Sequence, residues 1–258
     1  MIDSVHRVRA ALVAASVLLA GCGAGTAGKP GPGAGGEPAQ APAAAASRAA
    51  APGHTPAAPR TTPSGRLPGL GPEALAAIPS RTRQAVVVTG RGRNSSRSTV
   101  VLYERTEAGW RAGPSRPARN ALKGWTDHHR AGDLRSPTGV FTLTDAGGLL
   151  PDPGTRLPYD RSSAFTSPGT GFEGESLAGS FDYVVAIDYN RRPGTTPLDW
   201  TRPLGAGRGG GIWLHVDHGG PTHGCVALRE DDLVELMRTL DPALHPVVVM
   251  GDAAFLAR

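Results

Sequence analysis

The sequence predicts a mainly β domain with one or more short flanking helices. Three observations support this fold class. Short β-branched runs recur along the chain, each bounded by Gly, Pro, Asn or Asp. Only one run has a clear helical period, and long Gly- and Pro-rich loops, notably residues 145–180 and 191–211, separate the β-branched runs. Such loops often carry binding surfaces on a rigid sheet.

Each expected strand is a run of five to seven residues in the last two thirds of the chain. The expected strands are residues 84–89, 98–104, 140–144, 183–188, 212–216 and 246–250. One helix is expected over residues 230–240, where Leu233, Leu236, Met237 and Leu240 share a face. Its first turn is acidic, which suits the positive end of the helix dipole, and Pro242 follows its end.

The first 80 residues differ in composition from the rest of the 258-residue chain. Residues 23–80 are mostly Gly, Ala, Pro, Ser and Thr, and large apolar side chains are almost absent. Such a segment buries too little surface to offset its chain entropy, so we expect a disordered tether. Residues 81–258 are the right length for a single domain, and we expect a monomer.

Residues 1–22 are typical of an export signal. A basic start is followed by the apolar run 10–20, which is too short to span a membrane. The ending Leu19-Ala20-Gly21-Cys22 resembles the lipobox of bacterial lipoproteins. That resemblance implies cleavage before Cys22, a lipid on its sulfur, and a protein anchored at the outer face of the cell membrane. An ordinary secretory signal is the alternative.

The chain carries a net charge of +5 and only two cysteines. A basic exported protein suits an anionic envelope of wall polymers or lipid headgroups, and no nucleic-acid partner is expected. If Cys22 is lipidated, Cys225 is the sole thiol of the mature protein, so no internal disulfide can form.

Cys225 lies in a stretch that has the residues of thiol catalysis. Within residues 215–225 three histidines, His215, His218 and His223, accompany Cys225 and several glycines. A thiolate is a strong nucleophile near neutral pH, and an imidazole is the usual base that generates one. The arrangement therefore indicates covalent acyl chemistry.

The run Thr222-His223-Gly224-Cys225-Val226 resembles the signature of the L,D-transpeptidase catalytic domain (the YkuD-like family). Further segments support the resemblance, which spans roughly residues 84–251: His215 at a strand end, 136–141, 127–133 and 185–190. It implies an L,D-transpeptidase-like β-sandwich that cross-links or edits peptidoglycan stem peptides in the cell envelope. It implies no cofactor and no metal.

Carried onto this sequence, the family mechanism assigns Cys225 as the nucleophile and His215 as the base. Backbone N–H groups near Thr222, His223 and Gly224 would form the oxyanion hole and the site wall. An amine from a second stem peptide would resolve the thioester into a cross-link, whereas water would give carboxypeptidase activity.

Two histidines compete for the role of base. Strand alternation places Trp213 and His215 on one face and Ile212, Leu214 and Val216 on the other, which favours His215 and makes Trp213 a candidate substrate contact. His218 is the alternative, because His218-Gly219 matches the family's His-Gly dipeptide.

The sequence departs from the family pattern around this site. The spacing from His215 to Cys225 is short, Val216 replaces the usual Gly, and Ala227 replaces an Arg or Asn. Arg229 lies two residues beyond Ala227, so it is a candidate substitute in substrate binding. Acceptor choice therefore stays open.

Two other functions are compatible with the same residues. His215, His218, His223 and Cys225 could form a tetrahedral zinc set, as in exported peptidoglycan hydrolases. A lipid-tethered wall-binding module without turnover is the second alternative, because Ala227 lacks the polar side chain that the family has there.

Overall fold

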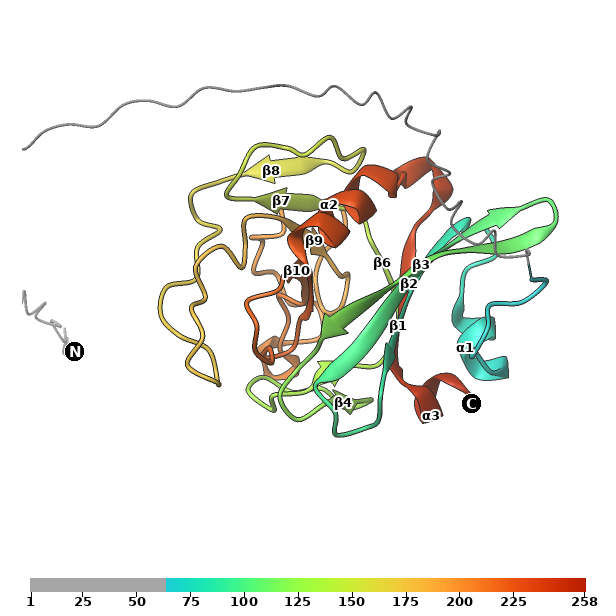
Figure 1. Cartoon of the computed structure of the whole chain (residues 1–258), viewed down its shortest axis with the longest axis horizontal. Helices are drawn as coiled ribbons and strands as arrows, with labels where there is room; N and C mark the ends of the chain where they lie inside the picture. Colours follow the sequence, from blue (N-terminus) through green and yellow to red (C-terminus); the bar gives the residue numbers. More distant parts are fainter. Residues whose placement is uncertain (1–63) are drawn as a thin grey trace, which may run out of the picture. The chain divides into compact units, whose positions relative to one another are not determined.

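The structure is a computed structural model that describes residues 64–258. It contains a curled sheet with strand order β6-β12-β1-β2-β3-β11-β10-β9-β7-β8 (Figure 1). Its strands are β1 (Gln84–Gly90), β2 (Arg97–Thr106), β3 (Gly109–Arg119), β6 (Gly139–Thr142), β7 (Ala146–Gly148), β8 (Tyr159–Arg161), β9 (Val184–Ala186), β10 (Trp213–Val216), β11 (Val226–Leu228) and β12 (Val247–Asp252). β4 (Trp125–Thr126) and β5 (Ser136–Pro137) pair separately.

Helices are short and lie around the sheet. They are α1 (Pro72–Ala77), α2 (Glu230–Thr239), α3 (Ala253–Leu256) and the 3-10 turns η1 (Ala206–Arg208) and η2 (Pro242–Leu244). Figure 1 shows α2 on one side of the β1-β2-β3 sheet and α1 and α3 on the other. The predicted mainly β sandwich with short flanking helices is therefore confirmed.

The curled sheet encloses the main apolar core. Alternate residues of β1, β2, β10, β11 and β12 meet there with the apolar face of α2, whose Leu233, Leu236 and Met237 are buried. The opposite face of β1 and β12 forms a second layer with Leu67, Trp110 and Leu256. β1 and β12 are each buried on both faces, which explains their unbroken valine runs.

All six expected strands occur, and each lies within two residues of its expected start. The helix expected over residues 230–240 occurs as α2, with its acidic first turn. β3 was not expected, because it contains two glycines and two prolines among its arginines; it becomes a strand by pairing with β2 along most of its length.

The expected boundary of the tether needs correction at its C-terminal end. Residues 64–80 were expected within the disordered segment, but they contain α1 and the buried side chain of Leu67. The backbone of Gly71 donates to the carbonyl of Leu256, and Ser64 pairs with Trp110, so this segment packs on the domain.

The other N-terminal predictions lie outside the described residues. They are the export signal over residues 1–22, the lipidation of Cys22, and the tether over residues 23–63. Among the helices of residues 64–258, none has the length and apolar character that a membrane span requires.

Candidate active site

Cys225 stands directly before β11, at the end of a tight turn. The hydroxyl of Thr222 donates to the carbonyl of Cys225 at 2.7 Å, which closes the turn. The Thr222 backbone in turn pairs with the segment after β3: its N–H donates to Asn120, and its carbonyl accepts from Leu122. Thr222 therefore braces the turn that holds Cys225. Its role as a site-wall residue stays a prediction.

The Cys225 sulfur is half-buried and contacts backbone rather than a side-chain base. It accepts from the Trp213 N–H at 3.4 Å, and its thiol donates to the Gly211 carbonyl at 3.5 Å. Burial raises the pKa of the thiol to about 11, and the Trp213 N–H offsets part of that effect. At neutral pH the resting sulfur is therefore a thiol that needs a base.

A cavity of about 440 Å³ opens beside the sulfur. Its lining contains Cys225, Gly224 and His223 on one side, and three consecutive glycines, Gly209 to Gly211, on another. All three glycines have positive φ, and a Cβ on Gly209 would lie 2.8 Å from the ring of His129. The glycines therefore keep the cavity open and bring the Gly211 carbonyl to the sulfur.

His215 lies on the same face of the sheet as the sulfur. Leu214 and Val226 face the main core, whereas Trp213 and Cys225 pack together on the opposite face, as strand alternation predicts. Neighbouring strands lie about 4.8 Å apart and two residues rise about 6.6 Å, so the Cα atoms of Cys225 and His215 are separated by roughly 8 Å. The two side chains can span that separation.

The tautomer of His215 is fixed by its own strand. Its Nδ1 lies 2.8 Å from the Val216 carbonyl, which can only accept, so the proton sits on Nδ1 and Nε2 keeps its lone pair. Burial lowers the pKa of the imidazole to about 4, so it is neutral at pH 7. Because the partner is a backbone carbonyl, valine serves at position 216 as well as glycine would.

The His215 imidazole is not part of the cavity wall that contains the sulfur. Among residues 64–258 no hydrogen bond joins His215 to Cys225, and His215 does not line the cavity. Instead the ring packs under Phe181, at a centroid distance of 5.4 Å.

Three backbone N–H groups beside the sulfur have no acceptor. Within the described residues no hydrogen bond uses the N–H of His223, Gly224 or Cys225. A Cβ on Gly224 would lie 2.9 Å from Ile212 Cδ1, so the Ile212 side chain or the turn would have to shift to make room for it. The His223 side chain points to the exposed Phe172, with ring centroids 4.6 Å apart. These N–H groups can receive an oxyanion.

The other candidate base has a different environment. His218 Nδ1 lies 3.1 Å from Glu175, and the ring of His218 stacks on that of His215 with centroids 5.8 Å apart. His223 pairs with Phe172 instead. In the part of the chain that the structure describes, no three His, Cys, Asp or Glu side chains converge as metal ligands, so the proposed zinc set of His215, His218, His223 and Cys225 does not form there.

Neither residue suggested as a substrate contact lines this cavity. Trp213 is buried against Phe165 and Phe181, and its backbone, rather than its ring, contacts the sulfur. Arg229 lies at the start of α2 with its side chain largely in solvent, near Asp231. Ala227 is fully buried beside His215, where a longer side chain would meet the imidazole's face of the sheet.

Two groups in the cavity wall were not singled out by the sequence. His129 is buried there; its segment, 127–133, supported the family resemblance without assigning this residue to the site. Arg202 stacks on the exposed ring of Trp200, with 4.8 Å between the guanidinium and the ring centroid. Both come from irregular loops, so neither periodicity nor motif spacing points to them.

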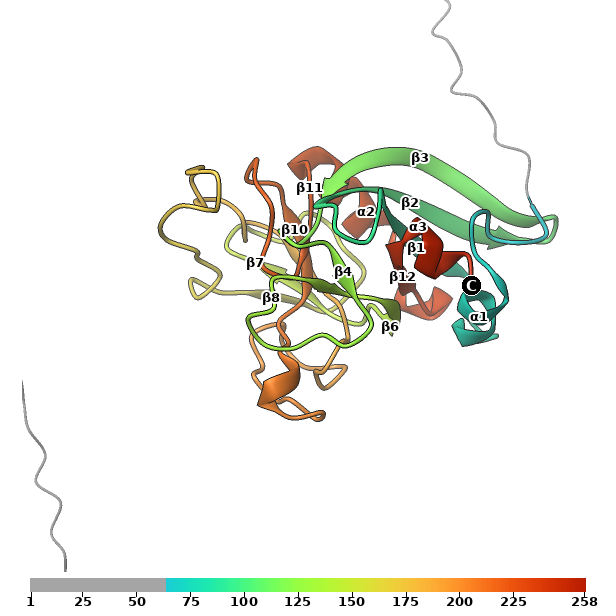
Figure 2. The same ribbon diagram turned by 90° about the horizontal axis from the view of Figure 1, so that it is seen from below.

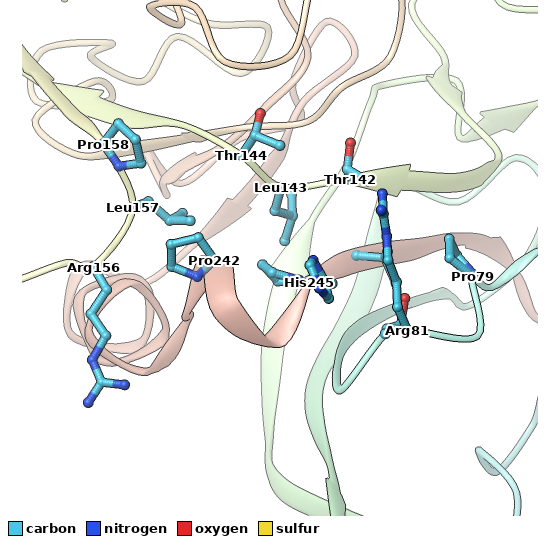
Figure 3. Close-up of a pocket in the computed structure, with 13 residues that line it drawn as sticks. Pro79, Arg81, Thr142, Leu143, Thr144, Arg156, Leu157, Pro158, Pro242 and His245 are labelled. Carbon is cyan, nitrogen blue, oxygen red and sulfur yellow. The ribbon is translucent and has the colours of Figure 1, made fainter.

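A second cavity, of about 450 Å³, lies elsewhere on the molecule (Figure 3). Buried Leu143 and Leu157 line it together with prolines and Arg81, and the Arg156 side chain points away from it. Figure 3 contains none of the predicted site residues.

Comparison with known proteins gives a family match over the region that contains Cys225. The model of the L,D-transpeptidase catalytic domain, YkuD, matches residues 80–249. Among solved structures, the chain is similar to Bdellovibrio bacteriovorus Bd1075, with a TM-score of 0.35 and 16% sequence identity. The alignment covers 66% of this chain and 48% of the other, so the chain spans about half the length of that protein. The search of curated proteins finds no match.

Proposed function

We propose that this chain is a cysteine-dependent transpeptidase. It belongs to the L,D-transpeptidase catalytic-domain family (YkuD), which acts on peptidoglycan stem peptides. The observation that carries the proposal is the position of the Cys225 sulfur. It lines an open cavity next to unpaired backbone N–H groups, on the same face as an imidazole whose Nε2 is free to accept a proton.

The first half-reaction acylates the enzyme. The Cys225 sulfur attacks the stem-peptide carbonyl that follows an L-centre, and its proton passes to His215 Nε2. The carbonyl oxygen becomes an oxyanion and receives hydrogen bonds from the N–H groups of Gly224 and Cys225. The intermediate then collapses: the C–N bond breaks, His215 returns the proton to the departing D-residue amine, and a thioester remains.

The second half-reaction releases the acyl group to an acceptor. An amine of a second stem peptide attacks the thioester carbonyl, the C–S bond breaks, and Cys225 recovers its proton. The product is a 3-3 cross-link, or an exchanged terminal residue when a free D-amino acid is the acceptor. Attack by water instead trims the stem peptide.

Before the reaction, the thiol of Cys225 and the imidazole of His215 are both uncharged. With a thiol pKa of about 11 and an imidazole pKa of about 4, proton transfer in the resting enzyme is unfavourable. The transfer becomes favourable only as the sulfur bonds to carbon, when the oxyanion hole carries the new charge. The thiol is thereby protected from adventitious oxidation outside the cell.

The cellular setting belongs to the same proposal. We expect a monomer that is anchored through a lipid on Cys22 at the outer face of the membrane. The segment between that lipid and residue 64 would let the catalytic domain reach stem peptides in the wall above.

A covalent probe and a product assay test the proposal. The purified chain is incubated with a carbapenem in one sample and with a muropeptide tetrapeptide in another, and the products of both are identified by mass spectrometry. We expect an adduct on the peptide that carries Cys225, and a 3-3 dimer or a tripeptide; Cys225→Ala should show neither. Tetrapeptide binding without an adduct or turnover in the unmodified chain would favour the wall-binding module.

A further inference from the structure

The wall of the Cys225 cavity contains a second imidazole, that of His129. Its side chain is only 6% exposed, yet it lines the cavity together with the nucleophile. A Cβ on Gly224, the residue before Cys225, would lie 3.8 Å from His129 Cε1, and a Cβ on Gly209 would lie 2.8 Å from His129 Nε2. The ring therefore lies between the nucleophile turn and the glycine wall, inside the cavity that His215 does not line.

The neighbours of His129 fix which nitrogen faces the cavity. Nδ1 lies 3.0 Å from an oxygen of Asp133, and the edge of the ring meets Tyr189 at a centroid distance of 5.3 Å. Asp133 is held in turn, because it accepts from the N–H groups of Arg130 and Arg135, each at 2.9 Å. The Nδ1–Asp133 pair is an ion-pair contact without hydrogen-bond geometry, and the nearby carboxylate still favours the proton on Nδ1. Nε2 is then the acceptor on the side of Gly209.

The charge state of His129 suits proton acceptance. Burial lowers the pKa of its imidazole most strongly, and Arg208 adds to that effect; Asp133 and the backbone of Arg135 oppose it without reversing it. The ring is therefore neutral at the pH of the envelope. A neutral imidazole can accept a proton from an entering ammonium ion. Because the ammonium ion is the weaker acid, this transfer is a minor pre-equilibrium that attack on the thioester draws forward.

We propose that His129 is the general base for the acceptor amine in the second half-reaction, with Asp133 as its positioning residue. The proposal rests on the proposed transpeptidase function. A stem-peptide amine enters as an ammonium ion, because its pKa is close to that of lysine, and an ammonium ion cannot attack a carbonyl.

The proton balance of the step is complete. His129 Nε2 takes one proton from the ammonium ion, and the free amine attacks the thioester carbon. As the C–N bond forms and the C–S bond breaks, the nitrogen loses a second proton, which passes through His215 to the sulfur. The products are an amide and the Cys225 thiol, and His129 gives its proton to solvent.

Two acceptors distinguish a base from a structural residue. The chain is acylated with a tetrapeptide donor, and transfer is measured by mass spectrometry to a tripeptide amine or to hydroxylamine, which is already neutral at neutral pH. In His129→Gln we expect transfer to the tripeptide amine to fall about a hundredfold, whereas transfer to hydroxylamine changes less than about twofold. Asp133→Asn should show the same selective loss, at about tenfold.

Adjacent His128 provides the matched control. Its side chain is 83% exposed, so His128→Gln should transfer to both acceptors at the unmodified rate. Equal loss with both acceptors in His129→Gln, or no loss with either, overturns the proposal; if that variant does not fold, the selectivity of Asp133→Asn decides. The carbapenem adduct separates the two hypotheses: its absence in the unmodified chain refutes the transpeptidase function, whereas its retention in His129→Gln shows an intact first half-reaction.

Discussion

At the scale of single residues, the proposed nucleophile is held in the protonated form. The Cys225 thiol donates to a carbonyl and has a pKa of about 11, and His215 has a pKa of about 4. Enzymes that keep a thiolate at rest place a positive charge beside it. No charged side chain contacts the sulfur among the described residues, so the site relies on transition-state stabilisation instead.

This protonation state predicts how the thiol reacts with alkylating agents. Because only the thiolate reacts, alkylation of Cys225 by iodoacetamide should rise about tenfold per pH unit from neutral pH and level off near pH 11. The rate is measured on the peptide that carries Cys225. Chain unfolded in urea provides the control, with a plateau near an ordinary thiol pKa of about 8.5. A plateau near that value in the folded chain would show that the thiol is not desolvated.

At the scale of elements, the site depends on two short parallel strands. β10 and β11 pair in parallel, although residues 217–225 alone connect them. Parallel neighbours usually need a longer crossover. Here each strand is only about 10 Å long, so a loop of this length can run back from the end of one strand to the start of the next without a helix. The short spacing from His215 to Cys225 is therefore a consequence of short strands, and it leaves the pairing intact.

The contact between the nucleophile turn and β10 predicts a mutational rescue. In Gly224→Ala the new Cβ would lie 2.9 Å from Ile212 Cδ1 and push the turn away from Trp213. We expect the rate of carbapenem acylation to fall at least tenfold, since losing one oxyanion donor costs about 3 kcal/mol. Ile212→Val removes that methyl group, at a cost of about 1 kcal/mol in stability, and should restore most of the rate in the double variant. An unrescued double variant would mean that Gly224 is needed for another reason.

Sequence patterns predicted the elements that bury apolar side chains, whereas the role of Cys225 as nucleophile stays a prediction from local spacing. The valine runs of β1 and β12 and the helical face of α2 carry their own periodicity. Nothing local marks His129, because its position depends on the loop of Gly209 to Gly211 folding back over it. Its neighbour Asp133, four residues on, is the one signal that could have drawn attention to it.

At the scale of the whole molecule, the segment that precedes β1 closes the face of the sheet remote from Cys225. Figure 2 shows α1 beside the C-terminal end of the chain, and Glu73 N–H donates to the carbonyl of Arg258. Leu67 enters the second apolar layer with Trp110 and Leu256. The folded domain therefore begins before residue 80, at which the family match starts.

This packing predicts that residues before the family match stabilise the domain. Leu67 is 2% exposed, so Leu67→Ala should lower the free energy of unfolding by roughly 3 kcal/mol and Tm by roughly 10 °C. Leu204, which is 61% exposed, is the matched control, and Leu204→Ala should change Tm by less than about 2 °C. Thermal unfolding followed by circular dichroism measures both. Since Leu67 lies in the layer opposite the main core, carbapenem acylation below the transition should keep its unmodified rate. Equal Tm values for the two variants would show that residues 64–80 belong to the tether and do not stabilise the domain.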